Sequence, residues 1–270
     1  MTWRIEQGIR LSGQAFLDRR LEPMLERFDW VYLGSEFCEN LLEPGLGSEA
    51  TRLQQMGKKV CLLTPLLTEK GAGALAAIFK RLRKLLASGH LSADRFEITI
   101  NDFGALELAA REKLPVRLNA GRQFCPNAFS SRARDLTVLN APSLDFLARY
   151  GITRYEISTT GHRPRTNFAP CGPFYRKQFS LTLYYPYLPL ATTRTCLVGM
   201  PDLGPEDPVR GIACGRECRA CTFEVVHPWI KEKLLVRGNT VFLEFPRKFY
   251  SSAEMLKRLR VDRLVYSPFP

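Results

Sequence analysis

The sequence predicts an α/β fold in the form of a single TIM-like (β/α) barrel with some irregular places. Short apolar runs rich in Val, Ile, Leu and Tyr alternate with helix-like segments, which favours a parallel sheet. The number of such runs is close to eight, and 270 residues is a common size for one closed barrel. We therefore expect one domain over residues 1–270, with a cysteine-bearing loop near the C-terminal face of the barrel.

Nine segments are predicted strands because they are short, rich in β-branched and aromatic residues, and bounded by turn residues. In chain order they are Trp30–Leu33, Val60–Leu63, Phe96–Ile100, Val116–Leu118, Leu136–Leu139, Arg154–Ser158, Leu181–Tyr185, Val241–Phe245 and Leu264–Tyr266.

Three segments between these strands have helical patterns. The clearest runs from Leu75 to Leu86, with apolar residues on one face and basic residues on the other. A second extends from Ser143, its expected N-cap, to about Arg149 and stops before Gly151. A third covers Ser252–Arg260. Residues 160–178 and 197–225 show no period and are expected to be inserted loops, which often carry function.

Composition narrows the classes of protein. Apolar residues make up 45% of the chain, which excludes a mostly disordered protein. No run approaches the roughly 20 apolar residues of a membrane span, and the first residues do not form an apolar signal region. We therefore expect a soluble, cytoplasmic protein, in which cysteines serve as metal ligands, catalysts or core residues rather than disulfides. The net charge of +12 favours an anionic ligand, an acidic partner or nucleic acid, or a merely solvated surface.

The cysteines are the strongest chemical signal. Cys196, Cys214, Cys218 and Cys221 lie within 26 residues of predicted loop, and Cys38 follows a predicted strand. Thiols crowded in this way predict a metal or iron–sulfur site that uses at least three of the four loop cysteines. Zinc also accepts four thiolates, but the two matched C-x-x-C pairs of a zinc ribbon are missing, so zinc fits less well. The other cysteines are expected to be core or structural thiols, namely Cys61, Cys125 and Cys171.

Polar residues follow several predicted strands and would meet at the mouth of a barrel. They are Glu36, Asn101, Asp102, Asn119, Arg122 and Glu156. Because a guanidinium holds a carboxylate or phosphate with two hydrogen bonds, Arg122 is the first choice for binding an anionic substrate, with Asn101, Asp102 and Glu36 beside it. The alternative is that these residues only cap strands and helices.

Several segments, taken in their order along the chain, resemble one known family. They are Val31–Cys38, Thr99–Gly104, Leu118–Arg122, Asn140–Glu156 and Leu188–Cys196. This order is similar to that in the collagenase-like "peptidase" family, in the type represented by UbiU and UbiV. The resemblance spans about residues 28–222. No Ser or Cys nucleophile motif stands near the three histidines, so proteolysis is not expected.

The resemblance implies a 4Fe–4S cluster on Cys38, Cys196, Cys214 and Cys218, with Cys221 as an alternative ligand. It also implies oxygen-independent hydroxylation of a ubiquinone precursor, together with a UbiU-like partner protein. Relatives hydroxylate RNA bases, and several use prephenate, a small anion, as the apparent oxygen source. Two alternatives therefore stay open: an RNA-base hydroxylating enzyme, whose basic surface and aromatics such as Tyr184 would hold RNA, and a zinc-stabilised binding protein without catalysis.

Overall fold

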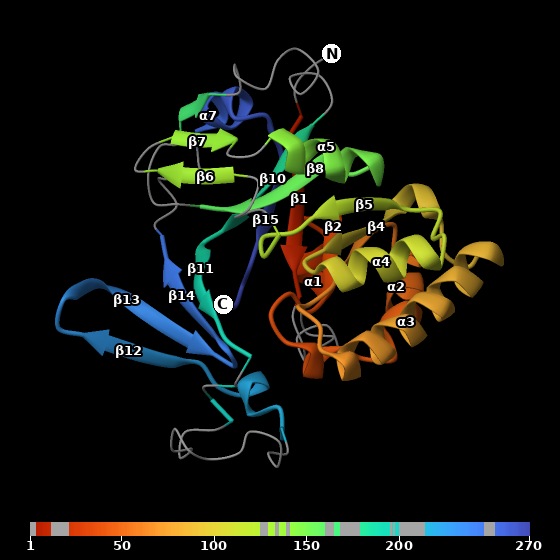
Figure 1. Ribbon diagram of the computed structural model, residues 1–270, viewed down its shortest axis with the longest axis horizontal. Helices are drawn as coiled ribbons and strands as arrows, with labels where there is room; N and C mark the ends of the chain where they lie inside the picture. Colours follow the sequence, from red (N-terminus) through yellow and green to blue (C-terminus); the bar gives the residue numbers. More distant parts are fainter. Residues whose placement is uncertain are drawn as a thin grey trace.

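The centre of the molecule is a closed barrel of eight parallel strands (Figure 1). The computed structural model describes residues 4–11, 22–124, 129–132, 135–138, 141–159, 165–167, 179–194, 196, 198–199, 214–245 and 252–270. The barrel strands are β1 (Glu6–Arg10), β2 (Trp30–Gly34), β3 (Lys59–Leu63), β4 (Phe96–Ile100), β5 (Arg117–Ala120), β8 (Arg154–Ser158), β10 (Ser180–Tyr185) and β15 (Val261–Tyr266). Around the barrel they run in the order β1-β15-β10-β8-β5-β4-β3-β2. The predicted fold, a TIM-like barrel, is confirmed.

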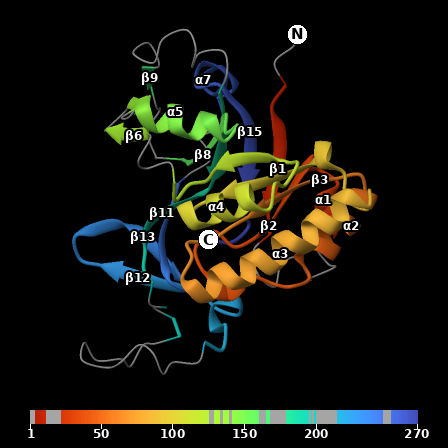
Figure 2. The same ribbon diagram turned by 45° about the vertical axis from the view of Figure 1, so that its right-hand side comes forward.

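Helices cover the outside of this barrel (Figure 2). They are α1 (Glu22–Leu25), α2 (Leu46–Gln55), α3 (Glu69–Ala87), α4 (Phe103–Arg111), α5 (Ala141–Arg149) and α7 (Ala253–Arg258). Helix α3 contains the predicted helix and buries the predicted apolar face, with Leu75, Phe79 and Leu82 in the core. The Thr68 side chain accepts a hydrogen bond from the Gly71 N–H and caps its first turn. Short 3-10 turns lie at Glu39–Leu41, Ala93–Arg95 and Glu217–Arg219.

Two further sheets accompany the barrel. One is antiparallel, with the strand order β11 (Tyr187–Thr192), β14 (Thr240–Glu244), β13 (Ile230–Arg237) and β12 (Phe223–His227). It extends away from the barrel wall on the side of β11 (Figure 1). The other contains β6 (Phe129–Arg132), β7 (Asp135–Val138) and β9 (Arg165–Asn167). Two of the nine predicted strands, β7 and β14, thus lie outside the barrel, and β12 begins inside a segment predicted to be a loop.

Strand β1 escaped prediction because its inward side carries no apolar side chain. Side chains alternate along a strand, so Glu6, Gly8 and Arg10 share the face that points into the barrel. A Cβ at Gly8 would stand 3.1 Å from the Tyr32 ring, so the position needs a glycine to fit the crowded interior. Only Ile9, on the outward face, has the apolar character expected of a strand. The remaining seven barrel strands correspond to predicted segments.

Other differences between the predicted and the observed elements are small. Helix α5 begins at Ala141, so Ser143 lies inside its first turn rather than at its N-cap. Gly151 follows it with a φ of 73°, in the left-handed conformation expected of a C-terminal glycine. Of the predicted loops, only residues 165–167 of the first and 198–199 and 214–225 of the second fall within the described residues. None of the helices in the described ranges is long and apolar enough to cross a membrane.

The apolar core lies between the barrel and its helices, whereas the inside of the barrel is largely polar. Outward side chains of the strands, such as Leu33 and Ile98, pack with Leu75 and Phe79 of α3. Aromatic and thiol side chains of alternate strand positions fill the interior, together with buried charged groups. A polar barrel interior needs a specific hydrogen-bond arrangement to be stable, because an unpaired buried polar group costs free energy. This arrangement forms the candidate site.

Candidate functional site

A buried ion cluster closes the barrel at the C-terminal ends of its strands, here called the mouth. Glu36, which follows β2, has no exposed surface and lies between two arginines. Arg122 donates to both of its carboxylate oxygens, at 2.9 and 2.6 Å, and the Arg10 Nε lies 2.8 Å from Oε2. Burial alone would raise the pKa of Glu36, but the charges of Arg122 and Arg10 outweigh it and lower this pKa. Glu36 is therefore ionised, and the three groups together carry one excess positive charge.

The Arg122 side chain is held on several sides. Its guanidinium carbon lies 4.1 Å from the centroid of the Tyr184 ring, in a cation–π contact. It also donates to the Ser158 hydroxyl at 3.0 Å. The turn that carries Arg122 is fixed by Asn101, whose amide oxygen accepts from the Gln123 N–H at 2.9 Å. This amide lies so close to Gly121 that a Cβ there would stand 2.2 Å from its oxygen.

Next to this cluster lies a second buried carboxyl, that of Glu156 on β8. Thr99 and Tyr184 each donate a hydroxyl hydrogen bond to it, at 2.8 Å. Burial, followed by the charge of the neighbouring Glu36, raises the pKa of Glu156 to about 8. Glu156 therefore keeps its proton at neutral pH. Since the carboxyl is neutral there, it does not cancel the excess positive charge of the arginines.

The structure brings some of the predicted mouth residues together and gives the others separate structural roles. Glu36 and Arg122 come together as an ion pair, and Glu156 stands beside them. Asn101 is buried and its amide binds backbone groups, including the Thr64 carbonyl at 2.9 Å, so it positions the Arg122 turn. Asp102 is the N-cap of α4 and accepts from the Gly104 N–H at 2.6 Å. Asn119 lies deeper in the barrel and donates to Glu97 at 2.8 Å.

Four of the predicted metal ligands share one neighbourhood beside the mouth. Burial, followed by the charges of Cys196, Cys38 and Cys214, raises the pKa of Cys218 to about 11. Burial likewise raises the pKa of Cys38, to which Cys214 and Cys196 again contribute. These thiols come from the loop after β2, the segment after β11 and the turn before β12. We call Cys38, Cys196, Cys214 and Cys218 the thiol group.

One buried amide joins the segments that carry the thiol group. Asn239, in the β13–β14 turn, donates to the Phe37 carbonyl at 2.8 Å and to the Thr193 carbonyl at 2.7 Å. Phe37 precedes Cys38 in the chain, and Thr193 stands three residues before Cys196. The adjacent Gly238 has a φ of 61° and packs against Cys218, so that a Cβ would stand 3.3 Å from the Cys218 Cβ.

Glu43 forms a second connection to the same region. It accepts from Arg216 at 2.7 Å and also from Arg219, which flank Cys218 in the chain. Because Glu43 belongs to the loop that follows Cys38, these ion pairs bind the Cys214–Cys221 turn to that loop. Cys221 itself donates to the Glu217 carbonyl at 3.2 Å.

The donor set suits a metal by its chemistry, because four thiolates can hold zinc or a 4Fe–4S cluster. Among the described side chains, no group of three or more His, Cys, Asp or Glu is arranged to hold a metal ion as it stands. Cys38 contributes to the raised pKa of Cys218, and Cys221 packs against the same cluster as Cys218 and Cys196, so Cys221 stays an alternative ligand. Cys61 is fully buried and its thiol lies 3.1 Å from the Thr99 hydroxyl, as expected of a core cysteine. Cys125 and Cys171 lie outside the described residues.

Several residues that build this site were not identified from the sequence. Arg10 ends a strand that was not predicted, and Asn239 is a common type of turn residue. Arg237 is half-buried beside them, stacks at 5.3 Å on Phe269 and has no acidic partner among the residues described. Its charge helps to lower the pKa of Arg10 to about 10, after burial. The only local signal was the Gly238–Asn239 pair, which is typical of a hairpin turn.

Comparisons with known proteins give solved structures of low similarity and identify no family. No protein-family model matches the chain, and no curated protein matches it. Solved structures of similar form include a glycoside hydrolase family 18 N-acetylglucosaminidase from Paenibacillus barengoltzii, with 11% identity, a TM-score of 0.38, and coverage of 97% of this chain and 94% of that chain. A family 18 chitinase from Cycas revoluta in complex with (GlcNAc)4 has 12% identity, a TM-score of 0.41 and coverage of 97% and 94%. Likenesses this low carry no information on activity.

Proposed function

We propose that the protein holds a 4Fe–4S cluster on the thiol group and takes part in oxygen-independent hydroxylation. The substrate would be a ubiquinone precursor, and the protein would act with a UbiU-like partner. Within its family the sequence resembles UbiV most. The observation that carries the proposal is that Cys38 shares one neighbourhood with Cys196, Cys214 and Cys218, although it is far from all three in the chain.

The construction around the thiols supports a metal site rather than ordinary packing. Core cysteines are usually scattered among apolar side chains, as Cys61 is within the barrel. Here the Asn239 amide donates two hydrogen bonds and the Glu43 carboxylate accepts one from Arg216. These bonds hold the cysteine-bearing segments together. An iron–sulfur cluster on such thiolates would supply electron transfer, with a potential set by the surrounding charges and hydrogen bonds.

The mouth supports a small anionic substrate or co-substrate, such as prephenate. Glu36 and Cys38 are two residues apart, so the thiol group borders the ion cluster. Arg10 and Arg122 share one carboxylate, and Glu156 stays protonated, which leaves positive charge in a region of low dielectric. Arg122 donates to both carboxylate oxygens of Glu36. We therefore assign it an electrostatic role, in which its positive charge attracts the anion. We assign direct contact with the anion to the half-buried Arg237, which lies near Arg10 and has no acidic partner among the described residues.

The two alternatives receive less support. For RNA binding, Tyr184 was an expected stacking platform, but it is fully buried and stacks on Arg122 instead. Zinc would use the same four thiols, and only the metal content of the protein separates it from an iron–sulfur cluster.

The test is metal analysis of the full chain purified without oxygen. We expect a brown protein with iron and acid-labile sulfide in near-equal amounts. Cys214→Ala and Cys218→Ala should each lose the bound iron, because each removes one of four thiolates. Cys61→Ala is the matched control: it should keep the iron and cost only modest stability. Cys221→Ala, also expected to keep the iron, tests the alternative ligand.

Two results would contradict the proposal. Stoichiometric zinc without iron in an anaerobic preparation would exclude the cluster and favour a zinc-stabilised binding protein. Unchanged iron in both Cys214→Ala and Cys218→Ala would show that the thiol group is not the site. Whether the protein acts on a ubiquinone precursor is tested separately, by restored ubiquinone synthesis in anaerobic cells that lack the corresponding activity.

A further inference from the structure

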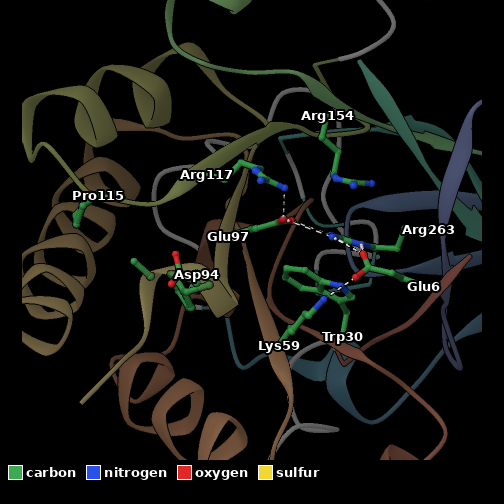
Figure 3. A pocket seen from close by; sticks show the side chains of 11 residues that line it. Glu6, Trp30, Lys59, Asp94, Glu97, Pro115, Arg117, Arg154 and Arg263 are labelled. Carbon is green, nitrogen blue, oxygen red and sulfur yellow. Dashed lines mark hydrogen bonds and ion pairs between the residues drawn. The ribbon is translucent and has the colours of Figure 1, made fainter. Parts of the chain in front are cut away.

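A polar cavity lies at the end of the barrel opposite the mouth, where the strands begin (Figure 3). Its volume is about 530 Å³, and most of the residues that line it are charged. The lining includes Glu6, Lys59, Glu97, Arg117, Arg154 and Arg263, each near the N-terminal end of a different strand or, for Arg263, on β15. We call this cavity the lower pocket. It is independent of the thiol group and of the mouth.

The floor of the lower pocket is a saturated ion network. Arg263, with 1% of its side chain exposed, donates to Glu97 at 2.8 Å and to Glu6 at 3.0 Å. Glu97 also accepts from the Asn119 amide at 2.8 Å. These short contacts satisfy the two carboxylates from inside the barrel. The floor therefore needs no ligand.

The wall of the pocket, in contrast, presents unused donors. Arg154 uses both terminal nitrogens on Asp262, at 2.6 and 3.2 Å, but its buried Nε–H has no hydrogen-bond partner. Arg117 is 60% exposed and its ion pair with Glu97 is long, at 3.4 Å, because Glu97 is already held by Arg263. Figure 3 shows the Arg117 side chain above Glu97, and the Arg154 side chain to its right, above Arg263.

We propose that the lower pocket binds an oxyanion, a carboxylate or phosphoryl group, between Arg117 and Arg154. Such a group accepts several N–H hydrogen bonds at once and would satisfy the Arg154 Nε–H, which is costly to leave buried and unpaired. Lys59, 41% exposed at the rim, is already paired with Glu6 at 2.7 Å, and Asp94 also lines the cavity, so the donors left for the oxyanion are those of Arg117 and Arg154. The cavity is larger than an inorganic ion, so an organic molecule that carries the oxyanion fits.

The experiment is calorimetric titration of the full chain with inorganic phosphate and with acetate, at constant ionic strength set by KCl. We expect one of the two anions to bind at this pocket, and the tighter one identifies the class of oxyanion. Arg117→Ala should weaken this binding about tenfold or more, because it removes the most accessible donor. The bound anion should also raise the melting temperature of the unmodified chain by about 2–4 °C, and raise that of Arg117→Ala much less.

Lys70→Ala is the matched control, since it removes the same charge from an exposed position in the first turn of α3, at the other end of the barrel. It should bind the anion as tightly as the unmodified chain. Arg154→Lys keeps the charge opposite Asp262 but lacks the Nε donor, so it should bind more weakly, and circular dichroism reports whether it folds. Anion binding at the mouth would survive in Arg117→Ala. Equal binding by the unmodified chain and Arg117→Ala, or equal losses in Arg117→Ala and Lys70→Ala, would overturn the proposal.

Discussion

The two ends of the barrel bury the same kinds of charged side chain in opposite ratios. At the lower end one arginine, Arg263, bonds two carboxylates, Glu6 and Glu97. At the mouth one carboxylate, Glu36, bonds two arginines, Arg10 and Arg122. Both clusters are buried, so each must satisfy its own charges with little help from water.

The ratio of arginines to carboxylates at each end of the barrel decides whether the acids there are ionised. At the lower end Arg263 and Lys59 outweigh the effect of burial and lower the pKa of Glu6 to about 2. At the mouth the arginines are engaged by Glu36, while burial and then the charge of Glu36 raise the pKa of Glu156 to about 8, although the hydroxyl donors of Thr99 and Tyr184 act to lower it. The lower end is thus a set of ordinary ion pairs, whereas the mouth holds positive charge and an exchangeable proton.

The largest expected effect comes from removing the carboxylate that the mouth arginines share. Glu36→Gln leaves Arg10 and Arg122 buried without an acid, and should lower the free energy of unfolding by about 3–5 kcal/mol. The matched change at the lower end, Glu97→Gln, should cost less, because Arg263 keeps Glu6. Urea unfolding of both variants measures the difference. If Glu36→Gln lost less free energy of unfolding than Glu97→Gln, the difference proposed between the two ends of the barrel would be wrong.

An effect of intermediate size on the free energy of unfolding is expected from the ionisation of Glu156, and this effect depends on pH. The unfolded chain releases this proton near the ordinary pKa of 4.5, whereas the folded chain keeps it up to about 8. Between these values rising pH therefore favours the unfolded state, and this group lowers stability by up to about 1.4 kcal/mol per pH unit. Glu156→Gln, which cannot ionise, should remove this slope.

The measurement is urea unfolding of the unmodified chain and Glu156→Gln at several pH values between 5 and 8. Because the charge of Glu36 contributes to the raised pKa of Glu156, the slope should also shrink in Glu36→Gln. Identical slopes in the unmodified chain and Glu156→Gln would show that this carboxyl is ionised throughout the range.

The smallest effect on stability is expected from Arg117 at the lower end. Its contact with Glu97 is long and its side chain is mostly exposed, so Arg117→Ala should change the free energy of unfolding by less than about 1 kcal/mol in the absence of phosphate or acetate. Urea unfolding in a chloride buffer checks this. A large loss would mean that Arg117 is part of the saturated network of the floor, and the donor available to a ligand would then be the Arg154 Nε alone.

The sequence by itself determined the fold class and most of the barrel. Seven of the eight barrel strands lie where short apolar runs bounded by turn residues predict them. Apolar periodicity also located α3, because burial of one helix face depends on residues only three or four positions apart. The same local reasoning failed for β1, since its inward residues are charged or glycine and pair only with distant strands.

Sequence also pointed to Cys38, Cys196, Cys214 and Cys218 as candidate ligands, but only through crowding and resemblance. The tertiary structure decided that these thiols are neighbours, and that Asn239 and Glu43 hold their segments together.

The tertiary structure alone also decided the roles of the polar residues that follow the strands. The sequence singled out Arg122 as the residue that binds an anionic substrate and placed Glu36 and Asn101 beside it, as polar residues at strand ends. In the fold Glu36 forms ion pairs with Arg122, 86 residues away, and with Arg10 from the first strand. The Asn101 side chain instead forms hydrogen bonds with backbone groups. The physical reason is that the charge state and hydrogen bonds of a buried group depend on neighbours brought in by barrel closure, and these neighbours are not adjacent in the chain.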